Sequence, residues 1–372
     1  CIVLGLFLSL MKKMNVQPKY LWAASLLTAF SPINLVLSIT IWKDITYTFT
    51  VILCCLIFLK IGTKGSSWFL SNRNILYLSI SLVLPFLIRW NGLSITIGGI
   101  FFLLICYPKM YRRFIFSGII TTAFILIIKG PMFNYFDIKK DNWLMYNLPI
   151  HQMGSFLSSN VKFNNDEIAF LNKISDTSNS WDYECGRAIA NAWGKTLMYD
   201  KDYFFKNKSE FMEIYFRKIL DNPSALIEYY KCSSRYIWDP FAYMVSMKAL
   251  KTIPRPSDKI NNFNTYDGIR WIPYINEFKI ESDSFIPSIV KPFTLFIKKT
   301  IFIWKPAIFL YLVILLIIIN FIYKSKVILF FVPIVLHTLG LALVSIAPEF
   351  RFQYPLVFFS HFAWVSIFIK NE

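Results

Sequence analysis

Residues 38–48 read SITIWKDITYT, a short polar break between two long apolar runs. The first run covers residues 20–41 and the second covers residues 45–61. A helix needs roughly 20 apolar residues to cross about 30 Å of hydrocarbon. The polar break, with Trp42, Lys43 and Asp44 together, is therefore predicted to be the turn between two transmembrane helices.

The composition of the whole chain favours the same interpretation. Of its 372 residues, 56% are hydrophobic, 18% are aromatic and only 16% are charged. These proportions lie outside the usual range of soluble globular domains. Six further apolar runs are either close to the length of a span or bounded by charges and turn residues. Together with the first two, the eight runs are 20–41, 45–61, 74–89, 92–107, 113–129, 300–323, 327–347 and 353–369. We therefore predict an α-helical polytopic membrane protein with about eight full transmembrane helices.

The first ten residues, CIVLGLFLSL, are also apolar, and no hydrophilic start or signal-peptide n-region precedes them. Position 1 is Cys and not Met. We therefore expect residues 1–10 to be the end of a ninth, partial span in a chain truncated upstream.

The basic residues of the short loops predict the orientation of the chain. If Lys12, Lys13 and Lys19 are cytoplasmic, Lys and Arg concentrate in every second loop, while the outer turns hold one basic residue each. This distribution follows the positive-inside rule and places the polar stretch on the outer side. We expect transmembrane helices in 1–129, a mostly helical extracytoplasmic domain in 130–299 before the last three helices, and C-terminal transmembrane helices in 300–372, all in the cytoplasmic (plasma) membrane.

The formal net charge of +17 fits this topology. Because the basic residues are spread over many loops, they indicate contact with membrane lipids and no binding of nucleic acid.

The expected outer domain contains patterns typical of helices. Residues 165–174 begin with an acidic turn, residues 208–220 repeat apolar side chains at helical spacing, and residues 223–238 begin with Pro. Residues 252–292 show no clear period and are expected to be loops. Cys185 and Cys232 both lie in this domain, and the sequence leaves open whether they pair.

Charged residues at the ends of spans are the first candidates for a functional site, because charge at membrane depth is costly unless it is paired or faces water. Trp42 and Lys43 also fit an interfacial anchor, in which Trp lies at the headgroups and Lys snorkels. Asp44 has too short a side chain to snorkel far, so the anchor does not explain it.

Further candidates lie in two other outer turns and early in the outer domain. Arg89, Asn91 and Gly92 are expected to form a tight turn. Arg89 is either part of a functional site or a lone contact to a lipid headgroup. Glu349 and Arg351 precede the final span, either as a local ion pair or with Arg351 as a phosphate ligand. His151 and Gln152 are the last pair of candidates. The alternative is that they serve only the structure of the domain.

Four of these stretches together resemble a known family. The stretches are FSPINLVLSITIWKD (30–44), LIRWNG (87–92), HQMG (151–154) and PEFRFQYPLVFF (348–359). In this order they resemble the bacterial multipass membrane proteins classed with GT-C-type glycosyltransferases, most closely a largely uncharacterised group. This chain departs from the group at Trp90, where Asn is usual, and at Phe352, where Tyr is usual.

The resemblance implies transfer of a sugar from a polyprenyl-phosphate carrier to a cell-envelope glycan or lipid acceptor, on the outer face of the membrane. The main acidic residue of the first outer loop would then precede residue 1, and Asp44 would lie in the second outer loop. Arg351 would lie near the carrier phosphate.

The chemistry of the transfer suggests roles for the candidates. It needs a carboxylate that accepts a proton, for which Asp44 is the candidate, and cations that stabilise the departing phosphate, for which Lys43, Arg89 and Arg351 are candidates. The supporting residues are Trp42, Asn91, His151, Gln152 and Glu349. A divalent metal ion, held by Asp44 and Glu349, is left open.

Two other functions remain as alternatives at this point. An O-antigen polymerase or ligase type of enzyme would use a diphosphate-linked glycan. A multipass transporter would show inverted repeats and spans broken at matching positions. The spans show few such breaks, and the charges gather at one face of the predicted bundle.

Overall fold

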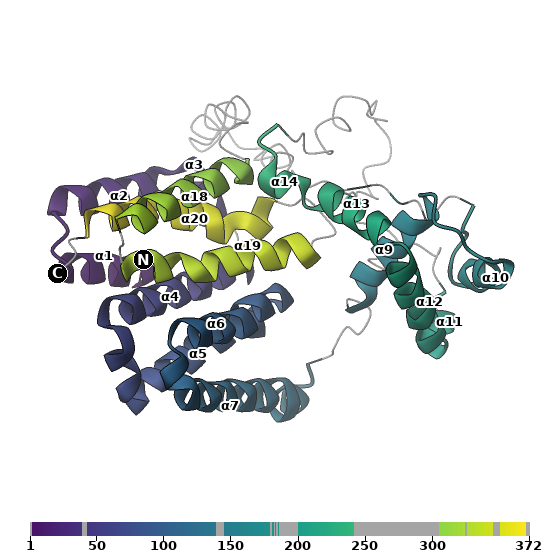
Figure 1. Ribbon diagram of the computed structural model, residues 1–372, viewed down its shortest axis with the longest axis horizontal. Coiled ribbons are helices and arrows are strands. Elements are labelled where there is room, and N and C mark those ends of the chain that lie inside the picture. Colours follow the sequence, from purple (N-terminus) through teal and green to yellow (C-terminus); the bar gives the residue numbers. More distant parts are fainter. Residues whose placement is uncertain are drawn as a thin grey trace, which may run out of the picture. The chain divides into compact units, whose positions relative to one another are not determined.

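The computed structural model describes residues 2–38, 43–138, 145–178, 181, 183, 185, 200–241, 305–323, 326–344 and 350–369. All regular secondary structure within these ranges is helical. The chain divides into two compact units (Figure 1). Unit 1 comprises Cys1–Lys139, Leu295–Leu341 and Phe350–Glu372, and unit 2 comprises Lys140–Thr294 and Ala342–Glu349. The expected loop at 252–292 lies outside the described residues.

The first part of unit 1 is a series of apolar helices joined by short turns. Its helices are α1 (Ile2–Lys13), α2 (Pro18–Phe30), α3 (Pro32–Ser38), α4 (Lys43–Lys64), η1 (Gly65–Leu70), α5 (Asn72–Ile88), η2 (Trp90–Gly92), α6 (Leu93–Cys106), η3 (Pro108–Met110), α7 (Tyr111–Ile127), η4 (Ile128–Met132) and α8 (Phe133–Tyr135). After unit 2 the chain returns with α18 (Pro306–Ile322), η10 (Lys326–Phe331), α19 (Val332–Val344), η11 (Phe350–Gln353), α20 (Tyr354–Ala363) and η12 (Trp364–Phe368).

The span predicted at 20–41 is broken within its length. Ser31 has extended backbone angles between α2 and α3, and Pro32 follows it. Proline disfavours the helical conformation of the preceding residue, which accounts for the break between α2 and α3 at Ser31. The sequence predicted a span over 20–41 and did not predict this break in its helix.

Helix α4 is the centre of unit 1. It packs against α5, α20 and η10, and α5 in turn packs against α6 and α7. Side chains on several sides of α4 are fully buried, among them Val51, Ile52 and Cys54. A helix that is apolar and buried around most of its circumference is a core helix of its bundle. The first and last parts of the chain therefore share one core.

The outer surface of unit 1 is strongly apolar. On α6, Ile97, Phe101 and Ile105 are 61%, 64% and 62% exposed and follow one another at helical spacing on one face. Soluble proteins rarely expose such continuous apolar faces. Contact with lipid hydrocarbon accounts for these side chains.

Three helical segments of the described chain are long and apolar enough to cross a membrane: Lys43–Leu70, Pro108–Tyr135 and Val327–Val344. Four further apolar segments are shorter: Asn72–Ile88, Trp90–Cys106, Pro306–Ile322 and Tyr354–Phe368. The composition and the helices are thus typical of a membrane protein.

Unit 2 has its own helices and core. Its described helices are α9 (Asn147–Leu157), α10 (Asn165–Ile174), α11 (Lys201–Lys206), α12 (Lys208–Asp221), α13 (Pro223–Ser233) and α14 (Arg235–Trp238). The predicted helices at 165–174 and 208–220 are confirmed, whereas the one predicted at 223–238 is divided at Ser234. Its core is formed by Ile150, Met153, Phe156, Phe170, Leu171, Ile174, Trp181, Phe204, Phe211, Ile214 and Tyr215.

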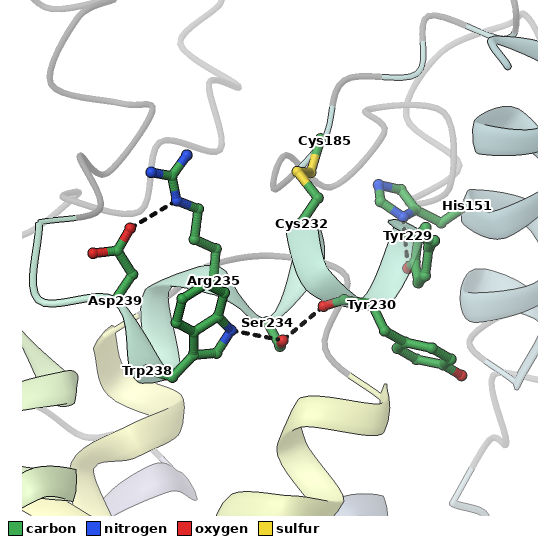
Figure 2. Close-up of a disulfide and its surroundings, with 9 residues drawn as sticks. All are labelled: His151, Cys185, Tyr229, Tyr230, Cys232, Ser234, Arg235, Trp238 and Asp239. Carbon is green, nitrogen blue, oxygen red and sulfur yellow. Dashed lines mark hydrogen bonds and ion pairs between the residues drawn. A yellow bond between two sulfur atoms is a disulfide. The ribbon is translucent and has the colours of Figure 1, made fainter. Parts of the chain in front are cut away.

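A disulfide joins Cys185 to Cys232 on α13, with a Cα–Cα distance of 6.2 Å (Figure 2). The pairing that the sequence left open is thus made in the structure. Because Tyr229 lies one helical turn before Cys232, the disulfide ties the segment around residue 185 to the part of α13 that carries this tyrosine.

Candidate functional site

The main charged feature of unit 1 is an ion pair between Asp44 and Arg89. Asp44 lies in the first turn of α4, where the helix dipole favours negative charge. Arg89 directly follows α5, and its backbone N–H donates to the carbonyl oxygen of Pro85 at 2.9 Å. The two side chains are 14% (Arg89) and 5% (Asp44) exposed, so the pair is largely removed from solvent.

Aromatic rings cover the guanidinium of Arg89. Its central carbon lies 4.4 Å from the centre of the Phe352 ring and 5.8 Å from that of Tyr47. Arg is well suited to such sites because its planar group stacks on aromatic faces while its N–H groups bind carboxylates. The rings and the carboxylate thereby fix the orientation of Arg89.

Tyr47 connects the pair to a buried histidine. The Tyr47 hydroxyl lies 2.9 Å from Nδ1 of His337 on α19, and both side chains are buried. Tyr47 is one helical turn after Asp44, so both point from the same face of α4. The site therefore contains a carboxylate, a guanidinium, a phenol and an imidazole from α4, α5 and α19.

In the turn that carries Arg89, the backbone of Gly92 lies against the backbone at the end of α5. A Cβ atom at Gly92 would overlap the backbone of Pro85 and Phe86. The backbone of Gly92 has ordinary right-handed angles, so glycine is needed here for space and not for a left-handed conformation. The contact between η2 and the end of α5 sets the position of Arg89.

Two buried amide side chains lie next to residues of the site in sequence: Asn91 is two residues after Arg89, and Gln353 directly follows Phe352. Within the described ranges, Nδ2 of Asn91 and both amide atoms of Gln353 have no hydrogen-bond partner. Buried polar groups are nearly always paired in folded proteins. These atoms are therefore candidates for contacts to water or to a polar ligand.

Lys129 is a further cation of unit 1. Its Nζ lies 3.6 Å from the centre of the Phe86 ring and 4.0 Å from that of Trp90. A short π-helical turn at Ile128–Met132 places it there. Trp90 is 60% exposed, so this cation–π group lies at the surface of the unit.

The remaining candidates from the outer turns are described only in part. Lys43 is the first residue of α4 and is exposed. Trp42 and Glu349 lie outside the described residues. The backbone of Arg351 lies in η11, next to Phe352, while its side chain is outside the described part.

His151 and Gln152 belong to unit 2 and are fully buried on α9. Nδ1 of His151 lies 2.8 Å from the Tyr229 hydroxyl, and Oε1 of Gln152 accepts a hydrogen bond from the Tyr215 hydroxyl. Both side chains thus hold tyrosines in place inside unit 2.

No group of three His, Cys, Asp or Glu side chains among the described residues is placed to hold a metal ion. The idea of a metal held by Asp44 and Glu349 concerns a residue outside that part of the chain, so it stays a hypothesis.

Sequence reasoning missed Tyr47, His337, Gln353 and Lys129. His337 could have been found, because an ionisable residue inside an apolar span is a functional candidate by default. Tyr47 could have been found from its helical spacing to Asp44. No local signal identifies Gln353, since only the tertiary fold buries it.

Neither the models of protein families, nor the curated proteins, nor the solved structures contain a match to this chain.

Proposed function

We propose that this protein is a membrane glycosyltransferase of GT-C type, which moves a sugar from a polyprenyl-phosphate carrier to a cell-envelope acceptor. The observation that carries the proposal is the Asp44–Arg89 ion pair in an apolar helical bundle. A buried ion pair rarely stabilises a fold more than apolar residues of the same volume would. A function that needs both charges explains their presence among apolar helices better than stability does.

The proposed reaction uses both charges. An acceptor hydroxyl attacks the anomeric carbon of the sugar, the bond to the carrier phosphate oxygen breaks, and the hydroxyl proton passes to a base. Asp44 is the proposed base, and Arg89 orients its carboxylate. Cations placed where the phosphate gains charge lower the barrier, and Lys43 and Arg351 are proposed for that role.

The proposed topology has about eight spans, with the shorter apolar helices crossing as well. The 17 residues of α5 reach about 25 Å at 1.5 Å per residue, a mismatch that local thinning of the bilayer can accommodate. Unit 2 is proposed to lie on the outer side of the cytoplasmic membrane. The Cys185–Cys232 disulfide supports this side, because disulfides persist in oxidising compartments.

The test uses membrane vesicles that contain the protein, a labelled polyprenyl-monophosphate sugar and a cell-envelope extract as acceptor. Asp44→Asn should lower label transfer by roughly a hundredfold or more at matched amounts of folded protein, about 2.7 kcal/mol of transition-state stabilisation. Asp166→Asn is the matched control, because Asp166 is an exposed aspartate in the first turn of α10. It should leave transfer unchanged.

Two results would contradict the proposal. Equal transfer by the wild type and Asp44→Asn would remove Asp44 from the chemistry. Transfer from a diphosphate-linked glycan alone would favour a polymerase or ligase instead.

A further inference from the structure

Unit 2 contains a pocket of its own, whose surface is mostly apolar and carries hydroxyl and amide groups from most of its lining residues. Its volume is about 340 Å³, and its described walls come from α9, the turn after it, Tyr183 and the start of α13. This volume lies at the small end of the range for small-molecule sites, roughly 300–1,000 Å³. The pocket is lined by Ser155, Ser159, Asn160, Val161, Tyr183, Asn222, Ser224, Ala225, Glu228 and Tyr229.

The lining is rich in groups that both donate and accept hydrogen bonds. Serine and tyrosine hydroxyls and asparagine amides can do either, which matches the hydroxyl groups of a sugar. Burial raises the pKa of Tyr183 and of Tyr229 above the ordinary value, so both phenols are neutral, and the Tyr229 hydroxyl is already paired with Nδ1 of His151. The partly buried Tyr183 ring adds apolar surface against which C–H groups can pack, whereas the Tyr229 ring is only 2% exposed.

The charge of the lining argues against an anionic ligand. Glu228 is its one charged side chain among the described residues, and neither Lys nor Arg lines the pocket there. Lys231 lies 2.6 Å from Glu228, on the exposed side of α13. A carboxylate or phosphate ligand would thus meet a carboxylate without a cation inside the pocket.

His151 contacts both tyrosines of the pocket and holds them in place. The ring centre of His151 lies 5.0 Å from that of Tyr183, and its Nδ1 lies 2.8 Å from the Tyr229 hydroxyl. Figure 2 shows His151 and Tyr229 together, with the Cys185–Cys232 disulfide one helical turn further along α13. Because Tyr183 is two residues from Cys185, the disulfide keeps this wall close to α13. A pre-formed wall lowers the entropic cost of binding.

We infer that this pocket binds a neutral sugar unit, as a glycan-binding site of the protein that does not depend on the reaction proposed for Asp44. His151 acts as a positioning residue, which orients Tyr229 without touching the sugar.

The test measures binding without any lipid-linked donor, so its result is independent of the transferase assay. The full chain in detergent, with its disulfide intact, is titrated with glucose, galactose, mannose and N-acetylglucosamine, and with glucuronic acid as the anionic counterpart. Saturation-transfer NMR reports contact and affinity. At least one neutral sugar should bind, and at least tenfold more tightly than glucuronic acid.

A pair of variants assigns the binding to the pocket. Ser224→Trp fills the pocket from an exposed position and should abolish the signal. Ser209→Trp makes the same change at an exposed serine of α12 outside the pocket, and should leave binding intact. Asn160→Ala, at an exposed lining position, should weaken binding at least tenfold without the bulk of Trp.

Three results would overturn the inference. The first is that no neutral sugar in the panel binds the wild type. The second is equal binding by Ser224→Trp and Ser209→Trp. The third is preference for glucuronic acid, which would mean that the ligand is anionic.

Discussion

The guanidinium of Arg89 lies 4.4 Å from the centre of the Phe352 ring. Arg89 precedes unit 2 in the chain, and Phe352 follows it. The contact therefore brings the end of the chain onto the Asp44–Arg89 pair. Arg351, the proposed phosphate ligand, is the direct neighbour of this phenylalanine in sequence.

The first prediction is that loss of either partner of the Asp44–Arg89 ion pair destabilises the fold. Asp44→Asn and Arg89→Gln should each cost about 3–5 kcal/mol of unfolding free energy, because each leaves a buried charge without its partner. The double variant should lose clearly less than the sum of the two. Denaturant unfolding in mild detergent, followed by tryptophan fluorescence, measures the cycle. Strictly additive losses would show that the two side chains do not interact.

Gly92→Ala should lower the free energy of unfolding by about 1–3 kcal/mol, since the new methyl group meets the backbone of Pro85. Gly118→Ala is the control, because a Cβ there would find only Ile100 at 3.9 Å. Helix propensity favours alanine over glycine, so the control should be neutral or slightly stabilising. If both variants have the same free energy of unfolding, the close contact at Gly92 does not affect stability.

Loss of the disulfide should destabilise unit 2. Cys185→Ser with Cys232→Ser should cost about 2–5 kcal/mol, because the unfolded chain regains the freedom that the bond removes. Limited proteolysis of the full chain should then cleave unit 2 faster. Cys106→Ser, at a free and exposed cysteine, is the control and should not change the rate. Unchanged proteolysis of the double variant would count against a stabilising role.

The lowered pKa of Glu167 predicts that the stability of unit 2 depends on pH. Burial alone would raise the pKa of this carboxyl, but hydrogen bonds from Lys218, Asn164 and Arg217 and the charge of Lys218 lower it below the ordinary value. A lowered pKa in the folded state gives stability that is fully present above the unfolded pKa, about 4.3. That stability is lost as the pH falls through the folded pKa.

Glu167→Gln keeps an amide oxygen for the cap at Asn164 but cannot be charged. The variant should be less stable than the wild type at pH 7, and the two should converge as the pH falls below about 4.3. Thermal unfolding across pH 3–7 measures this difference. A constant gap between the two proteins at all pH values would contradict the assignment.

The apolar runs allowed the helical fold class to be predicted from sequence, because burial of backbone polar groups in lipid leaves helices as the simplest solution. Helix boundaries followed where local chemistry decides them. Asn164 and Glu167 form a complete capping box at the predicted start of α10. The break at Ser31 was missed, although Pro32 was its visible cause.

The candidate site could be predicted only in part, for a physical reason. Asp44 and Arg89 were found singly as charges at span ends, but sequence spacing does not show that they face each other. The partner of Tyr47 is His337, which lies 290 positions away, so only the packing of α19 against the bundle reveals it. The same applies to His151, whose hydrogen bond to Tyr229 gives it a positioning role.

The close contact between Gly92 and Pro85 also limits how this region can move. Two backbones at van der Waals distance cannot approach further, so η2 cannot close more tightly onto the end of α5. Arg89 therefore cannot be moved by tightening of its own turn, and rotation of the side chains or a shift of a whole helix is needed to change its distance from Asp44.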